Sequence, residues 1–142
     1  MKIEIRKMEP IDRDYIVQTW LRANLSRSAI AKSIPRGVYF KNHNRLINYH
    51  LDFCQTKVAC DEEGFILGFI SYENIQEPSE CFDLLHFIFV RKEMRNQKIG
   101  TNLINCMKNA KDLFYTHQGD IYNLWGKYEK KVFNPYLFWG AR

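Results

Sequence analysis

Residues 82–111 constrain the fold more than any other part of the sequence. Residues 84–90 form an apolar run with aromatic and β-branched members, which is typical of a buried strand. A polar connection follows over residues 91–97, and apolar residues then recur at helical spacing from Ile99 onward, which predicts a helix. This order directs unpaired backbone N–H groups and the positive end of the helix dipole to one point, as in an anion site. Arg95 and Lys98 add positive charge there, although a solvated basic turn without a ligand would show the same pattern.

Length and composition indicate one domain over residues 1–142, and an apolar content of 46% can supply a single core. The net charge of +5 suits an anionic ligand, but the basic residues are scattered, so nucleic acid is not the expected partner. No apolar run approaches the roughly 20 residues of a membrane span, and the N-terminal segment lacks a signal-peptide pattern. We therefore expect a cytoplasmic protein without a membrane segment.

The cysteines and histidines do not predict a metal site. The four cysteines form no C-x-x-C pair and lie mostly in apolar patterns, so buried free thiols in a reducing compartment are expected. His43 and His50 are seven residues apart and could share a helix face, but zinc normally needs three or four protein ligands. No metal ion is predicted.

The remaining segments predict an α/β domain. Strands are predicted over residues 3–5, 56–60, 65–72, 113–117 and 132–139, and further helices over residues 13–24, 44–54 and 121–130. Residues 26–37 contain Pro35 and Gly37 and are predicted as a loop or a broken helix. Gly68 lies inside a predicted strand, where glycine indicates a bulge or a close approach of two backbones.

The turn after residues 84–90 carries a family resemblance. Residues 90–100 read V-R-K-E-M-R-N-Q-K-I-G, which resembles the acyl-CoA-binding motif V-x-P-x-x-R-G-x-G-I-G of the GNAT family of N-acetyltransferases. The positions that match are Val90, Arg95, Ile99 and Gly100. Lys92, Asn96 and Lys98 depart from the motif. Glycine at position 98 would allow close approach of a pyrophosphate or a positive φ, so Lys98 either blocks the ligand or offers its ammonium to it.

The resemblance extends over nearly the whole chain. The order of predicted elements is that of the family, and residues 128–133, Y-E-K-K-V-F, resemble its closing Y-E-K-x-G-F. Short stretches such as L-H-F-I-F-V and N-P-Y-L resemble small acetyltransferase-like proteins encoded by phages and prophages. The resemblance implies a single GNAT-like domain with a mixed, mostly antiparallel sheet of about six strands. Helices flank that sheet, and its fourth and fifth strands pair in parallel.

The resemblance also implies a reaction. Acetyl-CoA would lie as co-substrate in a cleft between the fourth and fifth strands, and a primary amine of unidentified origin would attack the thioester directly. The residues that the resemblance assigns to acetyl-CoA are Ile88, Phe89, Val90, Arg95, Asn96, Gln97, Lys98, Ile99, Gly100 and Thr101.

Two histidines are candidates for the proton acceptor. The family often places a base at the position of Leu84, which cannot serve. His86 lies on the same strand face and titrates near neutral pH, although it could equally be a hydrogen-bonded histidine within the sheet. His117 ends the fifth predicted strand, where the cleft would open, and its alternative is an ordinary loop histidine.

Tyr128 occupies the position of the family's proton donor near the sulfur of coenzyme A, and Tyr122 is the second candidate. Both could instead pack in an aromatic core. A second functional hypothesis also stays open, because Lys98, Asn96 and Leu84 depart from the family. In that hypothesis the chain is a degenerate GNAT-fold binding module for a protein or nucleic acid and does not catalyse. The aromatic C-terminal strand could form a homodimer edge.

Overall fold

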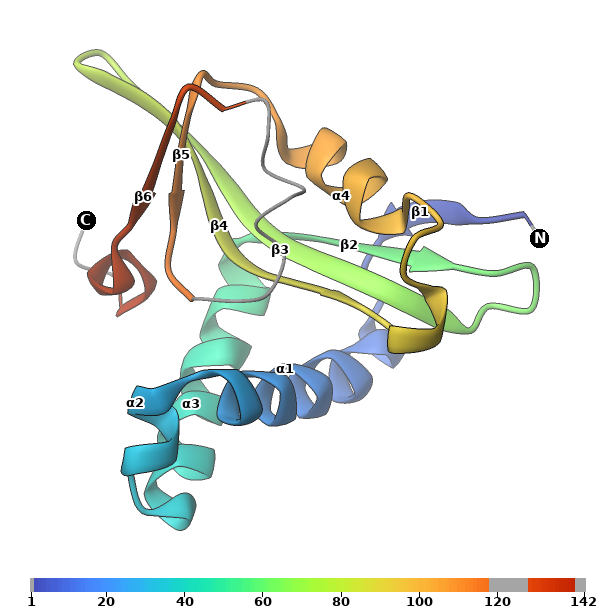
Figure 1. Ribbon diagram of the computed structural model, residues 1–142, viewed down its shortest axis with the longest axis horizontal. Helices are drawn as coiled ribbons and strands as arrows, with labels where there is room; N and C mark the ends of the chain where they lie inside the picture. The colour runs from blue at the N-terminus through green and yellow to red at the C-terminus, as the bar shows by residue number, and fades with distance from the viewer. Residues whose placement is uncertain (1, 118–127, 140–142) are drawn as a thin grey trace.

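A single twisted sheet organises the computed structural model, which describes residues 2–117 and 128–139 (Figure 1). Its strands are β1 (Glu4–Lys7), β2 (Gln55–Cys60), β3 (Ile66–Glu77), β4 (Glu80–Val90), β5 (Asp112–Tyr115) and β6 (Lys130–Phe133). They lie side by side in chain order. The pairs from β1 to β4 are antiparallel, whereas β5 pairs in parallel with both β4 and β6. The mixed, mostly antiparallel sheet and its parallel β4–β5 pair are as predicted.

Helices cover the sheet on both faces. They are α1 (Arg13–Arg27), α2 (Ala29–Ser33), α3 (Arg36–Phe53) and α4 (Ile99–Met107), with 3-10 turns η1 (Pro10–Asp12), η2 (Lys92–Met94) and η4 (Pro135–Trp139). The first three helices lie below one face and α4 lies on the other (Figure 1). Each face therefore has its own apolar core. Burial of each large apolar side chain in these cores contributes roughly 1.5–3 kcal/mol.

Gly68 confirms both parts of its prediction. The β2–β3 register shifts between Ala59 and Cys60, directly beside the pairing of Ala59 with Gly68. A Cβ atom on Gly68 would lie 2.6 Å from the backbone oxygen of Phe89, so only glycine lets β3 and β4 approach this closely here.

A second register shift lies in the middle of β4. Ser71 pairs with Phe87 and Tyr72 with Leu85, so His86 is the extra residue of a bulge. The bulge turns two consecutive side chains to the face of α1–α3. The Phe87 ring stacks on Trp20 of α1, with 5.0 Å between centroids, and the His86 ring lies 4.4 Å from His50 of α3.

Several element boundaries differ from those predicted. Of the two alternatives for residues 26–37, a loop or a broken helix, the broken helix is confirmed, because α1 ends at Arg27, α2 follows, and α3 starts at Arg36. The Ser28 side chain caps α2, and Pro35 is the N-cap of α3, which starts earlier than predicted. The strand predicted over residues 132–139 ends at Phe133, and η4 begins at Pro135, whose ring suits the first position of a helical turn. The fifth strand ends at Tyr115, and most of the helix predicted over residues 121–130 lies outside the described residues.

The cysteines are free, as predicted, but they are mostly not buried. Only Cys60 is buried among them, whereas Cys81 and Cys106 are exposed. Cys106 lies on the outer face of α4 beside the exposed Asn102 and Asn105. None of the helices that the structure describes has the length and apolar character needed to cross a membrane.

Candidate active site and coenzyme turn

The turn between β4 and α4 has a left-handed backbone at two positions where the acyl-CoA-binding motif has glycine and this chain does not. Asn96 has a φ of 71° and Lys98 a φ of 63°, and no other non-glycine residue of the described chain has a positive φ. These are two of the three positions where the acyl-CoA-binding motif carries glycine; the third is Gly100. Asparagine tolerates this region, but for lysine the left-handed conformation costs about 1–2 kcal/mol. The chain therefore keeps the motif's geometry at an energetic cost.

This turn ends in an open helix N-terminus. Lys98 is the N-cap of α4 and makes no side-chain hydrogen bond to the first N–H groups of the helix. Those groups have no carbonyl partner within the helix, and they carry its positive dipole. The side chains of Arg95 and Lys98 are exposed beside them. Such an arrangement could hold an anion such as a phosphate.

The sheet parts next to this turn. The parallel pairing of β4 with β5 runs only from Asp83–Leu113 to Leu85–Tyr115, and the Thr116 N–H then donates to the Leu85 carbonyl over 3.0 Å. Beyond that point β4 continues to Val90, and its side toward β5 has no strand partner among the described residues. An extended ligand could therefore pair with the backbone of residues 87–90.

A comparison with known protein families identifies the family of this chain. The sequence profile of the acetyltransferase (GNAT) family matches residues 17–118, which is most of the chain. The chain belongs to the acetyltransferase (GNAT) family. No curated protein matches it.

Several solved structures share the GNAT fold of this chain. A Pyrococcus furiosus protein assigned as an acetyl transferase is 18% identical with a TM-score of 0.63, over 98% of this chain and 89% of that one. A GNAT family acetyltransferase from Brucella melitensis, solved in complex with acetyl-CoA, is 18% identical with a TM-score of 0.58, over 88% and 82%. A ribosomal-protein-alanine N-acetyltransferase from Brucella melitensis biovar Abortus 2308 is 14% identical with a TM-score of 0.52, over 94% and 80%. At these identities the likeness concerns the fold.

All four histidines of this GNAT domain surround the ring of Phe138 in η4. The distances from the Phe138 centroid are 4.2 Å to His50, 4.5 Å to His117, 5.3 Å to His43 and 5.7 Å to His86. They come from α3, from the β4 bulge and from the end of β5, so only the folded chain brings them together.

Hydrogen bonds link three of these histidines in a row. His86 Nε2 lies 2.6 Å from Glu73 Oε2, and His86 Nδ1 lies 3.2 Å from Thr116 Oγ1. Thr116 Oγ1 is 2.9 Å from His117 Nδ1, and His117 Nε2 is 3.1 Å from His43 Nε2. Each hydroxyl or imidazole in this row can both donate and accept a hydrogen bond, so a proton can pass along the row.

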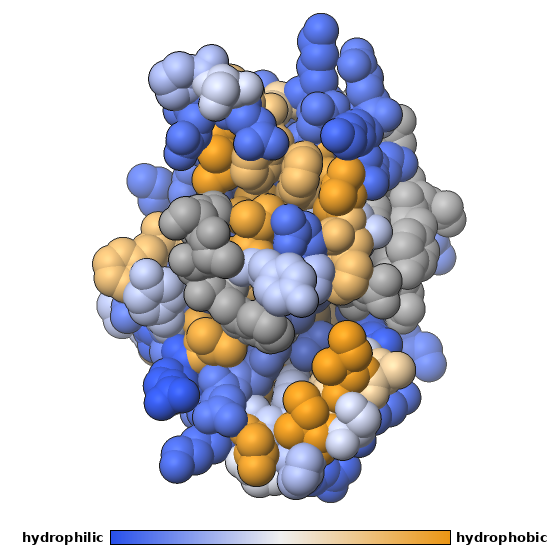
Figure 2. All heavy atoms as spheres, turned by 90° about the vertical axis from the view of Figure 1, so that its left-hand side faces the viewer, coloured by the Kyte–Doolittle hydropathy of each residue, from blue (hydrophilic) through white to orange (hydrophobic). Residues whose placement is uncertain are grey.

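The row ends at a pocket of about 310 Å³ between α1–α3 and the C-terminal segment. Its lining comprises Asn24, Ser28, Ala29, Ile30, Ala31, Ile34, Tyr39, His43, Thr116, His117, Phe133, Pro135, Tyr136 and Phe138. Apolar side chains are exposed on the face of the molecule that Figure 2 shows. Ile30 and Ile34 line the pocket and are themselves exposed. The pocket therefore combines apolar walls with imidazole nitrogens, which suits an organic molecule that carries a proton-exchanging group.

Burial keeps the pocket histidines neutral. It lowers the pKa of His43 from 6.5 to about 4. Burial, and next the nearby charge of His43, place the pKa of His117 well below its ordinary value. Both imidazoles are therefore uncharged at neutral pH, and the same burial makes each a weaker base than an exposed histidine.

Tyr128 lies on the opposite face of the sheet, in the core under α4. Its hydroxyl donates to Asp83 Oδ2 over 2.8 Å, and Lys108 Nζ lies 4.6 Å from its ring centroid. Burial, followed by the hydrogen bond to Asp83, raises the pKa of Tyr128 far above its ordinary value. The phenol therefore stays protonated at neutral pH. Tyr122 lies outside the described residues.

The candidates named from sequence thus fall into three places. His86 and His117 share the histidine row, Tyr128 lies across the sheet, and the coenzyme-binding candidates follow the β4 edge and the turn. Sequence reasoning missed Glu73 and Thr116, whose types and spacing carry no signal without the fold. It considered His43 only as a partner of His50.

Proposed function

We propose that this GNAT protein transfers an acetyl group from acetyl-CoA to a primary amine. The observation that carries this proposal is the left-handed backbone at Asn96 and Lys98, directly before the open N-terminus of α4. The same backbone is what the glycines of the acyl-CoA motif would provide. The unpaired side of β4 next to this turn gives additional support.

Acetyl-CoA would bind along this path. The pyrophosphate would accept hydrogen bonds from N–H groups of residues 95–101, with Arg95 and Lys98 balancing its charge. The pantetheine amides would pair with the backbone of residues 88–90, as an added strand pairs with a sheet edge. The thioester would then lie where β4 and β5 part, between the histidine row and Tyr128.

The acceptor amine would enter the pocket beside His117. Its nitrogen attacks the thioester carbonyl carbon, the carbon–sulfur bond breaks, and the amine loses a proton. His117 lines the pocket and would accept that proton, whereas His86 is fully buried and would act through Thr116 by orienting the His117 ring. Tyr128 would supply a proton to the leaving thiolate, as the family resemblance implies, and for this its hydroxyl would have to turn from Asp83 to the sulfur. Holding amine and thioester together would contribute several kcal/mol more.

Titration calorimetry with acetyl-CoA in phosphate-free buffer tests the coenzyme site. We expect one molecule bound per chain, weaker binding in Arg95→Ala, and a melting temperature that rises with acetyl-CoA concentration by mass action. No binding at millimolar acetyl-CoA would contradict the proposal. Lys98→Gly is the sharpest variant, because affinity should rise if the lysine obstructs the turn and fall if its ammonium contacts the phosphate.

Release of free thiol from acetyl-CoA in the presence of a panel of primary amines tests the transfer itself. Binding of acetyl-CoA without thiol release for any amine would favour the alternative, a GNAT-fold binding module. That hypothesis has a specific observation behind it, because Leu84 is fully buried and apolar where the family often has its base. A cytoplasmic location, a relationship to phage-encoded proteins and a homodimer stay predictions from sequence.

A further inference from the structure

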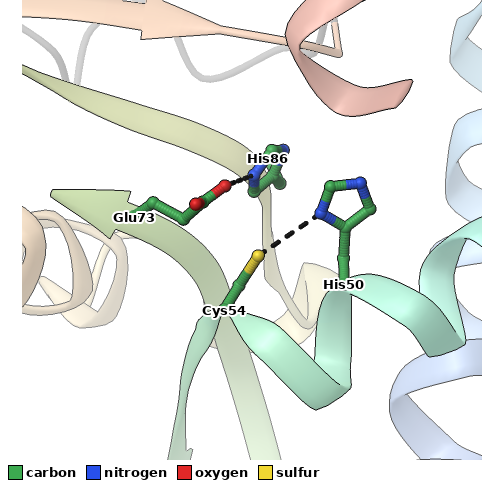
Figure 3. Close-up of side chains that lie close together, drawn as sticks. All are labelled: His50, Cys54, Glu73 and His86. Atoms are coloured by element: carbon green, nitrogen blue, oxygen red, sulfur yellow. Dashed lines mark hydrogen bonds and ion pairs between the residues drawn. The ribbon is translucent and has the colours of Figure 1, made fainter. Parts of the chain in front are cut away.

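Four potential metal ligands converge behind the pocket, where the last turn of α3 meets the β4 bulge. Figure 3 shows His50 and Cys54 from the helix facing Glu73 and His86 from the two strands. One donor atom from each, namely an imidazole nitrogen, the Cys54 sulfur or a carboxylate oxygen, lies within 4.8 Å of all the others.

The local structure explains why these side chains meet. His50 and Cys54 are four residues apart at the C-terminal end of α3, so they share one helix face, and His50 Nδ1 lies 3.3 Å from Cys54 Sγ. Glu73 is on β3, and the bulge at His86 turns this imidazole toward the same point, with Nε2 2.6 Å from Glu73 Oε2.

Both histidines have the second hydrogen bond that is typical of metal-bound imidazoles. His50 Nε2 contacts the backbone carbonyl of Phe138, which can only accept, so this nitrogen carries the proton. In the neutral ring the lone pair is then on Nδ1, the atom that faces Cys54. His86 Nδ1 is within 3.2 Å of the Thr116 hydroxyl, which leaves Nε2 to face the cluster. Such outer contacts fix the tautomer and the ring orientation of metal ligands.

Charge and burial also fit a divalent cation. One thiolate and one carboxylate together balance the charge of +2 on the ion, so the complex would be neutral in a site whose two imidazoles are buried. Glu73 has a relative side-chain exposure of 19%, which provides access from solvent. Mixed sulfur, nitrogen and carboxylate donors are those that Zn²⁺ accepts.

We propose that His50 Nδ1, Cys54 Sγ, a Glu73 carboxylate oxygen and His86 Nε2 bind one zinc ion in tetrahedral geometry. Zinc bond lengths near 2.0 Å for nitrogen and 2.3 Å for sulfur place tetrahedral ligands about 3.3–3.5 Å apart. The His50–Cys54 separation of 3.3 Å is close to this value, and the His86–Glu73 pair opens when the metal replaces the proton between them.

With four protein ligands the site would be structural. It fastens the end of α3 to the β4 bulge, and it holds the His86 ring that contacts Thr116 in the histidine row. The zinc site rests on the geometry of these four residues and not on the proposed acetyl transfer, so either can fail without the other.

Cobalt titration of the metal-stripped, tag-free full chain tests the site without any activity measurement. We expect one cobalt ion per chain, with a thiolate-to-cobalt charge-transfer band and the intense visible absorption of a tetrahedral complex, both lost when zinc is added. Cys54→Ser should abolish the charge-transfer band. Cys81→Ser removes an exposed cysteine outside the cluster and should leave the band unchanged. Absence of the band, or a band that survives Cys54→Ser, would overturn the proposal.

Competition with a chromogenic chelator gives the zinc affinity. Because removal of even an outer-shell partner typically weakens metal binding 10–100-fold, we expect Glu73→Gln to weaken zinc binding by more than about 10-fold. Circular dichroism shows whether each variant folds. If variants of the buried histidines do not fold, the variants at the partly exposed Glu73 and Cys54 still test the site. Equal zinc affinity in the wild type and in Glu73→Gln would exclude the carboxylate from the site.

Discussion

The two faces of β4 carry polar networks of opposite character. On the α4 face the fully buried Asp83 carboxylate accepts hydrogen bonds from the Asn74 amide, from the N–H groups of Asn109 and Ala110, and from Tyr128. Every one of these partners donates to the same group. The network has one arrangement of protons, and it fixes the end of α4 to the sheet.

On the α3 face, the Glu73 carboxylate can only accept, whereas the row from His86 to His43 consists of imidazoles and a hydroxyl that can exchange the roles of donor and acceptor. Such a row can have more than one arrangement of protons. The comparison teaches that the hydrogen-bond roles are fixed around Asp83 and can change along the row from His86 to His43. The parting of β4 and β5 lies between them.

The largest expected effect is on the rate of acetyl transfer, and it concerns the histidines on the α3 face of the sheet. His117→Gln removes the proposed proton acceptor, so kcat should fall roughly 10²–10⁴-fold, which is the usual contribution of a positioned acid or base. Calorimetry should give an unchanged Kd for acetyl-CoA, because the β4–α4 turn is untouched. Thr116→Val leaves His117 in place but breaks its link to His86, so a smaller loss of kcat is expected. An unchanged kcat in His117→Gln would remove this histidine from the mechanism.

Among the variants considered, Asp83→Asn, on the α4 face of the sheet, should produce the largest loss of stability. The asparagine amide presents its own N–H groups to buried donors that now share the Asp83 carboxylate, so the unfolding free energy should fall by about 3 kcal/mol. Urea denaturation measures this change. Asp14→Asn, at an exposed position in the first turn of α1, is the control and should cost about 0.5 kcal/mol. If the unfolding free energy of Asp83→Asn fell by no more than that of the Asp14→Asn control, the Asp83 network would not hold α4 to the sheet.

The pH dependence of stability should come from the histidine face. Burial lowers the pKa of His43 from 6.5 to about 4. As the pH falls from about 6.5 to about 4, His43 binds a proton in the unfolded chain before it does so in the folded one. The unfolding free energy should therefore decrease by up to about 3 kcal/mol. Urea denaturation across this pH range measures the slope, and His117, whose pKa is lowered as well, adds in the same direction. The slope should become shallower in His43→Gln, and an equal slope in that variant would assign the effect to other groups.

Local signals made one part of this molecule predictable. The β4–turn–α4 unit follows from an apolar run, a polar connection and helical spacing, and α4 begins at Ile99 as predicted. The two positive φ values fall where the family motif has glycine. These features depend on residues close in sequence, so the sequence pattern contains them. The same kind of reasoning left residues 26–37 open between a loop and a broken helix and placed the start of α3 too late, because Pro35 is compatible with a helix start as well as with a loop.

The histidine face was not predictable, because it depends on pairing between distant segments. The bulge that places His86 exists only in the register of β3 against β4. Glu73, Thr116 and Phe138 meet the histidines after the sheet and η4 have formed. The spacing of His50 and Cys54 is a local signal that could have been used, but two possible ligands on one helix gain meaning only when the strands supply the others.

Tyr128→Phe should give the smallest change in stability, and it separates the two roles of this residue. Asp83 keeps its other three donors in the variant, so the unfolding free energy should fall by about 1 kcal/mol, the typical contribution of one hydrogen bond. The rate of acetyl transfer should fall by at least about 10-fold if the phenol also protonates the leaving thiolate, because this effect is separate from folding. Urea denaturation and thiol release on the same preparation measure both, with Tyr49→Phe on the exposed side of α3 as the control. A loss of stability with full activity would restrict Tyr128 to its hydrogen bond with Asp83. The proton for the thiolate would then have to come from the histidine row or from solvent.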